Sequence, residues 1–187
     1  MDFKKANQFL SVNDKGHLTF EELDTVDLAK KYGTPLYLMS ESSINSNIKS
    51  YLDAIDGSFG DRGRVAYACK AFCCKEMARL ADNHGLWLDV VSSGELYTAL
   101  SADFPAERII FHGNNKSDSE LKLAVENSIG RVVVDNEYEL ERLINIAEAT
   151  GKVQKIQIRL KPGVDPDTHK YIRTGGINSK FGISLSE

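Results

Sequence analysis

The chain has 187 residues, of which 42% are hydrophobic and 27% are charged, as in an ordinary globular protein. Its formal net charge of -4 argues against nucleic-acid binding, which normally needs a basic patch or stripe. No apolar run approaches the roughly 18 residues that a membrane span requires. The first residues, MDFKKANQFL, also lack the apolar core of a secretory signal.

The first 35 residues differ in pattern from the remainder of the chain. A turn is expected at Asp14–Gly16, followed by a short helix that begins near Thr25. The segment TPLYLMS (34–40) is predicted to be a strand beginning at a proline, and ESSINSNIKSYLDAI (41–55) is predicted to be a helix. This stretch therefore belongs in part to a different domain from the rest.

From residue 64 onward, strand-like runs alternate with helix-like segments. Strands are expected at 64–71, 87–93, 108–114, 131–136 and 155–163, and helices at 75–85, 94–102, 117–130 and 137–151. Ser117 and Glu120 have the spacing of a capping box. The strand ends lie near residues 70, 91, 111, 134 and 160, so they are 21, 20, 23 and 26 residues apart. Such intervals are typical of βα units.

Repeated βα units predict a parallel α/β sheet, either open and doubly wound or closed into a (β/α)8 barrel. Barrel active sites are built at the C-terminal ends of the strands. Polar residues lie at or just after those ends, namely Lys70, Ser92, His112, Asn114, Asp135 and Lys161. The glycine-rich phosphate turn that often marks an open sheet does not occur. We therefore predict a barrel truncated to about five βα units, a piece of a longer protein.

The run RVAYACKAFCC (64–74) raises the question of whether Lys70 is reactive. Strand alternation places Lys70 on the same face as Ala66 and Ala68, whose small side chains leave room for its stem in a barrel interior. An amine that is buried or half-buried there could form a Schiff base with a carbonyl compound. The alternative is a lysine that ends the strand and reaches into solvent.

Several other candidates each have an ordinary explanation. Asp89 lies in the middle of a strand, where a carboxylate needs a partner that Lys70 or Lys180 could supply. His112 is otherwise a hydrogen-bonded loop residue, Arg159 an exposed edge residue and Lys180 a loop charge. Their recurrence at the ends of successive βα units favours one shared site.

The cysteines lie in one cluster at Cys69, Cys73 and Cys74. Three cysteines cannot all pair within a chain, so we expect no disulfide framework and a reducing cytoplasm. A metal site lacks a fourth ligand at a usual spacing, since the nearest histidine, His84, lies at a helix end. We therefore expect no metal and interpret the thiols as packing residues.

Five segments carry a family resemblance: YACKAF, LDVVSSGELYTAL, FPAERIIFHGNNKSDSEL, ENSIGRVVVDNEYELERL and GVDPDTHKYIRTGGINSKFGISL. From about residue 32 onward they resemble the diaminopimelate decarboxylases, fold-type III enzymes with a pyridoxal 5'-phosphate (PLP) barrel of the alanine racemase-like type. FHGNNK and THKYIRTG…SKFG are more typical of this family than of its ornithine and arginine decarboxylase relatives. The resemblance implies a cytoplasmic, homodimeric carboxy-lyase of lysine biosynthesis that converts meso-2,6-diaminopimelate to L-lysine and CO2.

The resemblance also implies residue roles. Lys70 matches the lysine that forms the Schiff base with PLP, and Asp89 matches a catalytic aspartate beside it. The positions that it implies for cofactor binding are Lys70, Asp89, Ser92, His112, Asn114, Arg159 and Lys180. Two residues depart from the family pattern: Phe72 stands where asparagine is commonest, and Ser93 where glycine is usual.

Further parts of the family's site are implied to lie beyond this chain. They are a histidine stacked on the ring, a glycine-rich phosphate cradle, a glutamate at the pyridine nitrogen, a C-terminal β-domain and a partner subunit. Gly175–Gly176 is not that cradle, because no helix start follows it. We expect residues 1–35 to pack with the β-domain, residues 36–187 to form an incomplete barrel, and the fragment itself to be inactive. A PLP decarboxylase of another basic amino acid and a non-catalytic barrel fragment or regulator remain alternatives.

Overall fold

The structure, a computed structural model, describes residues 9–163 and 180–184. The chain divides into two compact units, Met1–Ala54 and Ile55–Glu187. The division follows contacts within this chain. The predicted boundary at residues 35–36 concerned packing against a further domain, and it stays a prediction.

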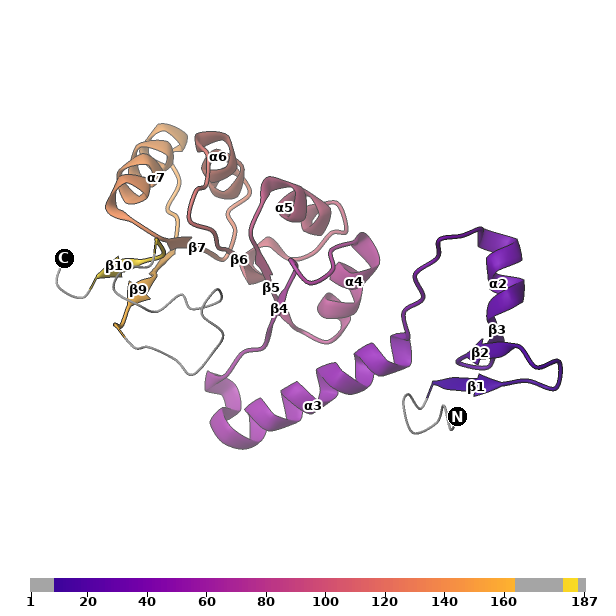
Figure 1. Cartoon of the computed structure of the whole chain (residues 1–187). Helices are drawn as coiled ribbons and strands as arrows, with labels where there is room; N and C mark the ends of the chain where they lie inside the picture. Colours follow the sequence, from indigo (N-terminus) through magenta and orange to yellow (C-terminus); the bar gives the residue numbers. More distant parts are fainter. Residues whose placement is uncertain (1–8, 164–179, 185–187) are drawn as a thin grey trace. The chain divides into compact units, whose positions relative to one another are not determined.

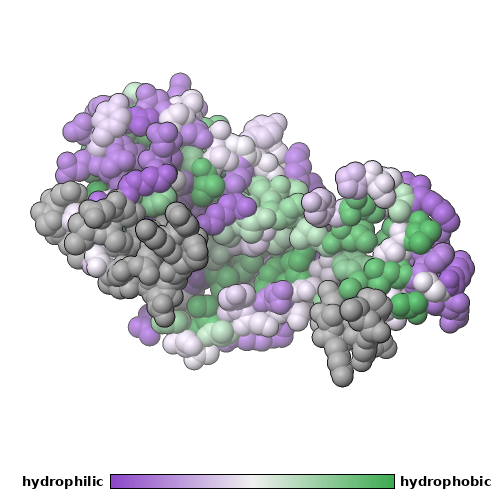
Figure 2. Space-filling view, in the orientation of Figure 1, coloured by the Kyte–Doolittle hydropathy of each residue, from purple (hydrophilic) through white to green (hydrophobic). Residues whose placement is uncertain are grey.

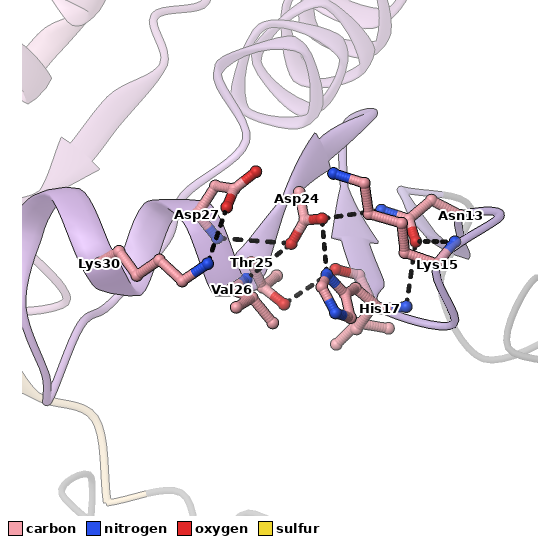
Figure 3. A network of polar contacts seen from close by, with 9 residues as sticks. Asn13, Lys15, His17, Asp24, Thr25, Val26, Asp27 and Lys30 are labelled. Atoms are coloured by element: carbon pink, nitrogen blue, oxygen red, sulfur yellow. Dashed lines mark hydrogen bonds and ion pairs between the residues drawn. The ribbon is translucent and has the colours of Figure 1, made fainter.

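The first unit is a small antiparallel sheet followed by a helix. Strands β1 (Leu10–Val12), β2 (Leu18–Phe20) and β3 (Leu23–Asp24) pair in the order β1-β2-β3, and α2 (Thr25–Tyr32) follows directly. Asp24 begins the helix, since its side chain accepts hydrogen bonds from the N–H groups of Val26 and Asp27. Its Oδ2 lies 2.8 Å from both Asn13 Nδ2 and His17 Nδ1 (Figure 3). The predicted turn and the predicted helix start are both confirmed.

The prediction of a strand at 34–40 was wrong. These residues form no regular structure, and Leu36, Tyr37, Leu38 and Met39 are exposed. A strand is stabilised by ladder bonds to a neighbour, and the sheet of this unit consists of β1, β2 and β3. The apolar pattern indicated an extended segment but did not show whether a neighbouring strand was available to pair with it. The following helix, α3 (Glu41–Phe59), is longer than predicted and leads into the 3-10 turn η1 (Gly60–Arg62).

The second unit contains a five-stranded parallel sheet in the order β4-β5-β6-β7-β8. The spatial order is the chain order, so the described sheet has no switch point, as a barrel requires. Its strands are shorter than predicted, and η2 (Ala106–Arg108) precedes β6. The strands are β4 (Ala66–Ala68), β5 (Trp87–Val90), β6 (Ile109–Phe111), β7 (Arg131–Val134) and β8 (Ile156–Ile158), and the helices are α4 (Lys75–Asn83), α5 (Ser93–Leu100), α6 (Asp118–Glu126) and α7 (Glu137–Thr150).

Three of these helices begin in the same way. Ser92, Ser117 and Asn136 stand before α5, α6 and α7, and each side chain accepts the N–H of a glutamate three residues on. Ser117 and Glu120 form the complete capping box that the sequence predicted. Each of these helices therefore has a glutamate in its first turn.

The helices lie in a row on one side of the sheet (Figure 1). Alternate strand residues are buried against them, namely Leu88, Val90, Ile109, Phe111, Val132 and Val134. The intervening residues, among them Asp89 and His112, are half-buried on the opposite face. Hydrophilic residues dominate the outer surface of α6 and α7, whereas hydrophobic residues gather over β4–β6 (Figure 2). Asp89 and His112 thus lie on the face of the sheet that the helices leave uncovered.

The last predicted strand, 155–163, is divided in the structure. After β8, the short strand β9 (Leu160–Lys161) pairs in parallel with β10 (Ile183–Ser184). The break falls at Arg159, whose N–H donates to Val134 O while its C=O accepts from the N–H of Ile183. A single residue thereby joins two sheets. Within residues 9–163 and 180–184, no helix has the length and apolar character of a membrane span.

Candidate active site

The strand register brings the polar strand ends to one edge of the sheet. Ala68 pairs with Asp89, and Asp89 pairs with Ile110, two residues before His112. Because successive side chains alternate between faces, Asp89 and His112 share the face that the helices do not cover, and Lys70, in the turn after β4, lies close enough for its charge to act on Asp89. The same parity on β7 and β8 adds Asp135 and Arg159. The structure therefore assembles five of the sequence candidates at one edge.

Lys70 follows β4 in a turn. The N–H of Ala71 donates to Ala68 O at 3.1 Å, and the Tyr67 hydroxyl donates to Phe72 O at 2.9 Å. Lys70 is exposed, as in the alternative of a lysine that ends the strand and reaches into solvent. The physical reason is that β4 has one neighbour, β5, in the described sheet, so nothing covers the other side of the lysine.

Asp89 is half-buried, and its Oδ1 is buried without a hydrogen-bond donor among the residues that the structure describes. Burial raises the pKa of the Asp89 carboxyl, while the charges of His112 and Lys70 act in the opposite direction. The charge of Lys70 thus acts on Asp89, while the pairing of the two side chains stays a prediction. The other predicted partner, Lys180, has its Nζ 5.2 Å from the centre of the Phe181 ring.

His112 is half-buried at the end of β6, and its backbone N–H donates to Val90 O at 2.8 Å. Burial lowers the pKa of the imidazole. The carboxylates of Asp89 and Asp135 oppose that effect, and the positive charges of Arg159 and Lys116 reinforce it. Burial therefore favours the neutral form of the ring.

Arg159 is held between a carboxylate and an aromatic ring. Its Nη1 lies 3.2 Å from Asp135 Oδ1, and its guanidinium carbon lies 4.4 Å from the centre of the Phe181 ring. Asp135 is 2% exposed, and its Oδ2 also accepts the N–H of Gly182 at 3.1 Å. The reading of Arg159 as an exposed edge residue is therefore wrong. Asp135 joins Arg159 to the segment that contains Lys180.

The other candidates have structural contacts of their own. The Ser92 hydroxyl accepts the N–H of Glu95 at 3.3 Å, and Glu95 Oε2 in turn accepts the N–H of Val91 at 2.7 Å. Asn114 is half-buried in the loop after β6, and Lys161 is half-buried in β9. Gly175–Gly176 lies outside the described residues.

Sequence reasoning missed a buried ion pair behind this edge. Lys116 Nζ lies 2.7 Å from Glu139 Oε1, and each side chain is 2% exposed. Lysine and glutamate are almost never fully buried unless paired, so neither attracted notice. The available signal was position: Lys116 follows His112 by four residues, and Glu139 occupies the glutamate position of a helix start.

The three cysteines are free thiols. Cys69 is buried, and it lies in an apolar cluster with Tyr67, Cys73, Met77 and Leu88. Burial raises the pKa of the Cys69 and Cys73 thiols, which keeps them protonated. Cys69 and Cys73 therefore act as packing residues, whereas Cys74 also begins α4, because its Sγ accepts the N–H of Met77.

The family model "Pyridoxal-dependent decarboxylase, pyridoxal binding domain" matches residues 41–187. Among curated proteins, the diaminopimelate decarboxylase of Bacillus subtilis is 50% identical over 173 residues, which cover 92% of this chain and 39% of that protein. The enzyme of Bacillus methanolicus is 48% identical over 174 residues, which cover 93% of this chain and 40% of that protein. The chain thus spans about two fifths of the length of these relatives.

Solved structures give the same result. Diaminopimelate decarboxylase from M. jannaschii in complex with L-lysine has a TM-score of 0.82 and 35% identity, over 96% of this chain and 42% of that one. The Helicobacter pylori enzyme in complex with L-lysine has a TM-score of 0.74 and 31% identity, over 86% of this chain and 40% of that one. The predicted α/β barrel fold, present in part, is therefore confirmed. The family model matches well over half of the length of this chain. The chain therefore belongs to the pyridoxal-dependent decarboxylases and carries part of their pyridoxal-binding domain.

Proposed function

We propose that this chain is the N-terminal portion of a diaminopimelate decarboxylase, with Lys70 as the residue that attaches PLP. The observation that carries the proposal is the grouping of Lys70, Asp89 and His112 at the strand ends. Relatives at 50% and 48% identity with that enzyme name support the choice within the family.

The residues present fit PLP at this edge. Asp89 Oδ1 is a buried acceptor that lacks a donor among the described residues, and the charge of Lys70 acts on this carboxyl. A bound group that offers a donor, such as a protonated amine or ring nitrogen, would satisfy it. Lys70 is exposed and able to reach an aldehyde. Asp89, Ser92, His112, Asn114, Arg159 and Lys180 complete the proposed set.

PLP, when bound, supplies an aldehyde that condenses with amines and a ring that accepts the electron pair left by departing CO2. Lys70 would hold the cofactor through its amine, and its Nζ, when free, would hold or return a proton. Asp89 balances positive charge beside Lys70. Arg159, aimed by Asp135, provides a fixed cation for a carboxylate or phosphate.

The proposed substrate of the whole protein is meso-2,6-diaminopimelate, and the products are L-lysine and CO2. Two related structures contain L-lysine, which fits this product. We further propose that the whole protein is a cytoplasmic homodimer, whose C-terminal domain packs with residues 1–35. Free thiols at Cys69, Cys73 and Cys74 agree with a reducing compartment. By itself the chain is expected to be inactive.

The lysine assignment is tested by adding PLP to the 187-residue chain, reducing with borohydride and mapping the labelled peptide. We expect the label at Lys70 and its loss in Lys70→Ala. The control is Lys75→Ala, which removes an equally exposed lysine at the start of α4 and should leave labelling unchanged. Labelling that persists in Lys70→Ala, in this chain or in the full-length protein, would overturn the assignment.

Substrate choice is tested on the full-length protein by measuring CO2 release from meso-diaminopimelate, ornithine and arginine. We expect turnover of the first alone. Preference for ornithine or arginine would assign the protein to another basic amino acid. No turnover of any of them, together with normal labelling at Lys70, would favour the non-catalytic alternative.

A further inference from the structure

Lys116 is buried and surrounded by oxygen atoms. Its Nζ donates to Gly113 O at 2.6 Å and to Val133 O at 2.8 Å, and it lies 2.7 Å from Glu139 Oε1. Two of its three N–H donors are accepted by these carbonyl oxygens, and Glu139 Oε1 lies at ion-pair distance but accepts no hydrogen bond within the described residues. Burying a charged group is costly unless it is paired and hydrogen-bonded, so the two carbonyl bonds and the ion pair together indicate a specific role.

The three oxygens belong to three different elements. Gly113 lies in the loop after β6, Val133 lies in β7, and Glu139 lies in the first turn of α7. Lys116 therefore ties one loop to the neighbouring βα unit. That loop carries His112 and Asn114, two residues of the proposed site.

The contact acts on the peptide directly after His112. The N–H of His112 is held by Val90 O, and the next residue, Gly113, is held through its C=O by Lys116. Gly113 has φ of +126°, a conformation that side chains disfavour, and a Cβ there would lie 3.5 Å from Val91 O. The loop is thus anchored at the N–H of His112 and at the C=O of Gly113.

We propose that Lys116 is a positioning residue for the candidate site: through Gly113 O, Val133 O and Glu139 its ammonium holds the loop that places His112. The inference rests on the proposed function for its meaning in catalysis, but the geometry that it describes is independent of PLP. Its positive charge also disfavours protonation of His112, alongside burial and Arg159.

The test separates positioning from simple stability. Lys116→Met leaves Glu139 buried and unpaired, so it destabilises the fold in any case. The double variant Lys116→Met/Glu139→Leu removes both charges, which restores much of the stability but not the tie to Gly113. The matched control is Lys122→Met/Glu126→Leu, which removes an exposed pair of the same residue types on α6.

The readout is hydrogen exchange of the His112 amide in the 187-residue chain without PLP, with the Val90 amide as an internal reference. In the buried double variant we expect the His112 amide to exchange about tenfold faster, as the loss of one charge-assisted hydrogen bond implies. The reference amide and the control variant should match wild type. Wild-type protection of His112 in the double variant would overturn the proposal.

A second variant keeps the test decisive if the double variant fails to fold. Glu139→Gln neutralises the carboxylate but leaves both carbonyl contacts of Lys116. We expect lower stability with His112 protection within about twofold of wild type, since the tie to Gly113 remains. If protection of the His112 amide falls about tenfold or more in Glu139→Gln, the effect belongs to Glu139 and the proposed role of Lys116 is overturned. Neither result depends on labelling at Lys70, so failure of the proposed function is recognised separately.

Discussion

The two units of this chain are stabilised in different ways. In the first unit the buried residues among those described are Thr19, Ser40 and Ile48, and α2 buries none. The second unit has a continuous apolar core, in which Leu88, Leu96 and Phe111 are at most 1% exposed. Burial of apolar surface is the main favourable contribution to folding. The second unit therefore contains most of the folding free energy.

Polar contacts dominate the first unit instead. Asp24 joins the β1–β2 turn to the start of α2 through Asn13, His17 and Val26 (Figure 3). Glu21 accepts hydrogen bonds from Ser40 and Ser42. Meanwhile large apolar side chains such as Leu23 stay exposed. Such a unit acquires its shape from directional bonds, and the proposal that residues 1–35 pack with a further domain would give its apolar groups a partner.

The same substitution in both units gives the largest expected contrast. Leu88→Ala in β5, where the side chain is 1% exposed, should cost about 2–5 kcal/mol, because it removes core contacts and leaves a cavity. Leu23→Ala in β3, where the side chain is 57% exposed, should cost about 0.5 kcal/mol or less. Urea unfolding followed by residue-resolved hydrogen exchange measures both. Equal costs would contradict the comparison.

A glycine pair tests the second unit's closer packing at a smaller scale. Gly16 and Gly182 have nearly equal φ values, +76° and +75°. A Cβ at Gly16 would meet nothing within 4 Å, whereas at Gly182 it would lie 2.9 Å from Arg159 O. Gly16→Ala should therefore cost only the left-handed conformation, about 1–2 kcal/mol. Gly182→Ala should cost more and should release the Asp135 contact.

The measurement for the glycine pair is thermal unfolding together with exchange of the residue 182 amide, which Asp135 Oδ2 accepts in the wild type. Loss of that protection in Gly182→Ala, with Gly16→Ala affecting only the first unit, is the expected pattern. If the two substitutions cost the same, the close approach to Arg159 would be energetically irrelevant.

Much of the second unit could be predicted because its signals are local and repeated. Alternating apolar residues, capping residues such as Ser117 and regular spacing all indicated βα units. The strand predicted at 34–40 failed because a strand needs a partner that no local pattern supplies. The division of the last predicted strand at Arg159 failed for a related reason, since β9 pairs with β10, more than twenty residues further on.

The candidate site shows the same limit. Alternation placed Asp89 on the correct face, because the period of a strand is fixed by its backbone. The exposure of Lys70 could not be read from its own segment, since it depends on which strands flank β4. The pair of Lys116 and Glu139 was missed because both residue types usually lie at the surface, and only their three-dimensional contacts show otherwise.

The smallest expected effect is an opposite response of the two units to pH. The contact with His17, followed by those of Asn13 and Val26, holds the pKa of Asp24 well below its ordinary value of 3.8. Hydrogen bonds from Ser40 and Ser42 lower the pKa of Glu21. A carboxyl with a lowered pKa stabilises the fold above its ordinary value, and this contribution is lost as pH falls through the folded-state value. The first unit should therefore loosen on acidification.

In the second unit, burial raises the pKa of Asp89 from 3.8 and that of Glu139 from 4.5. Between the ordinary and the raised values the folded state binds more protons than the unfolded state, so stability falls as pH rises through that window. NMR intensities of each unit measure both trends when they are recorded from below roughly pH 2, where the Asp24 contribution is lost, to roughly pH 7. Asp24→Asn should abolish most of the stability that the first unit loses on acidification. Asp89→Asn should reduce the stability that the second unit loses as pH rises. The same sign of pH dependence in both units would show that Asp24 and Asp89 do not dominate their regions. Because each substitution should act only on its own unit, an effect of Asp24→Asn on the second unit would also contradict their separate stabilisation.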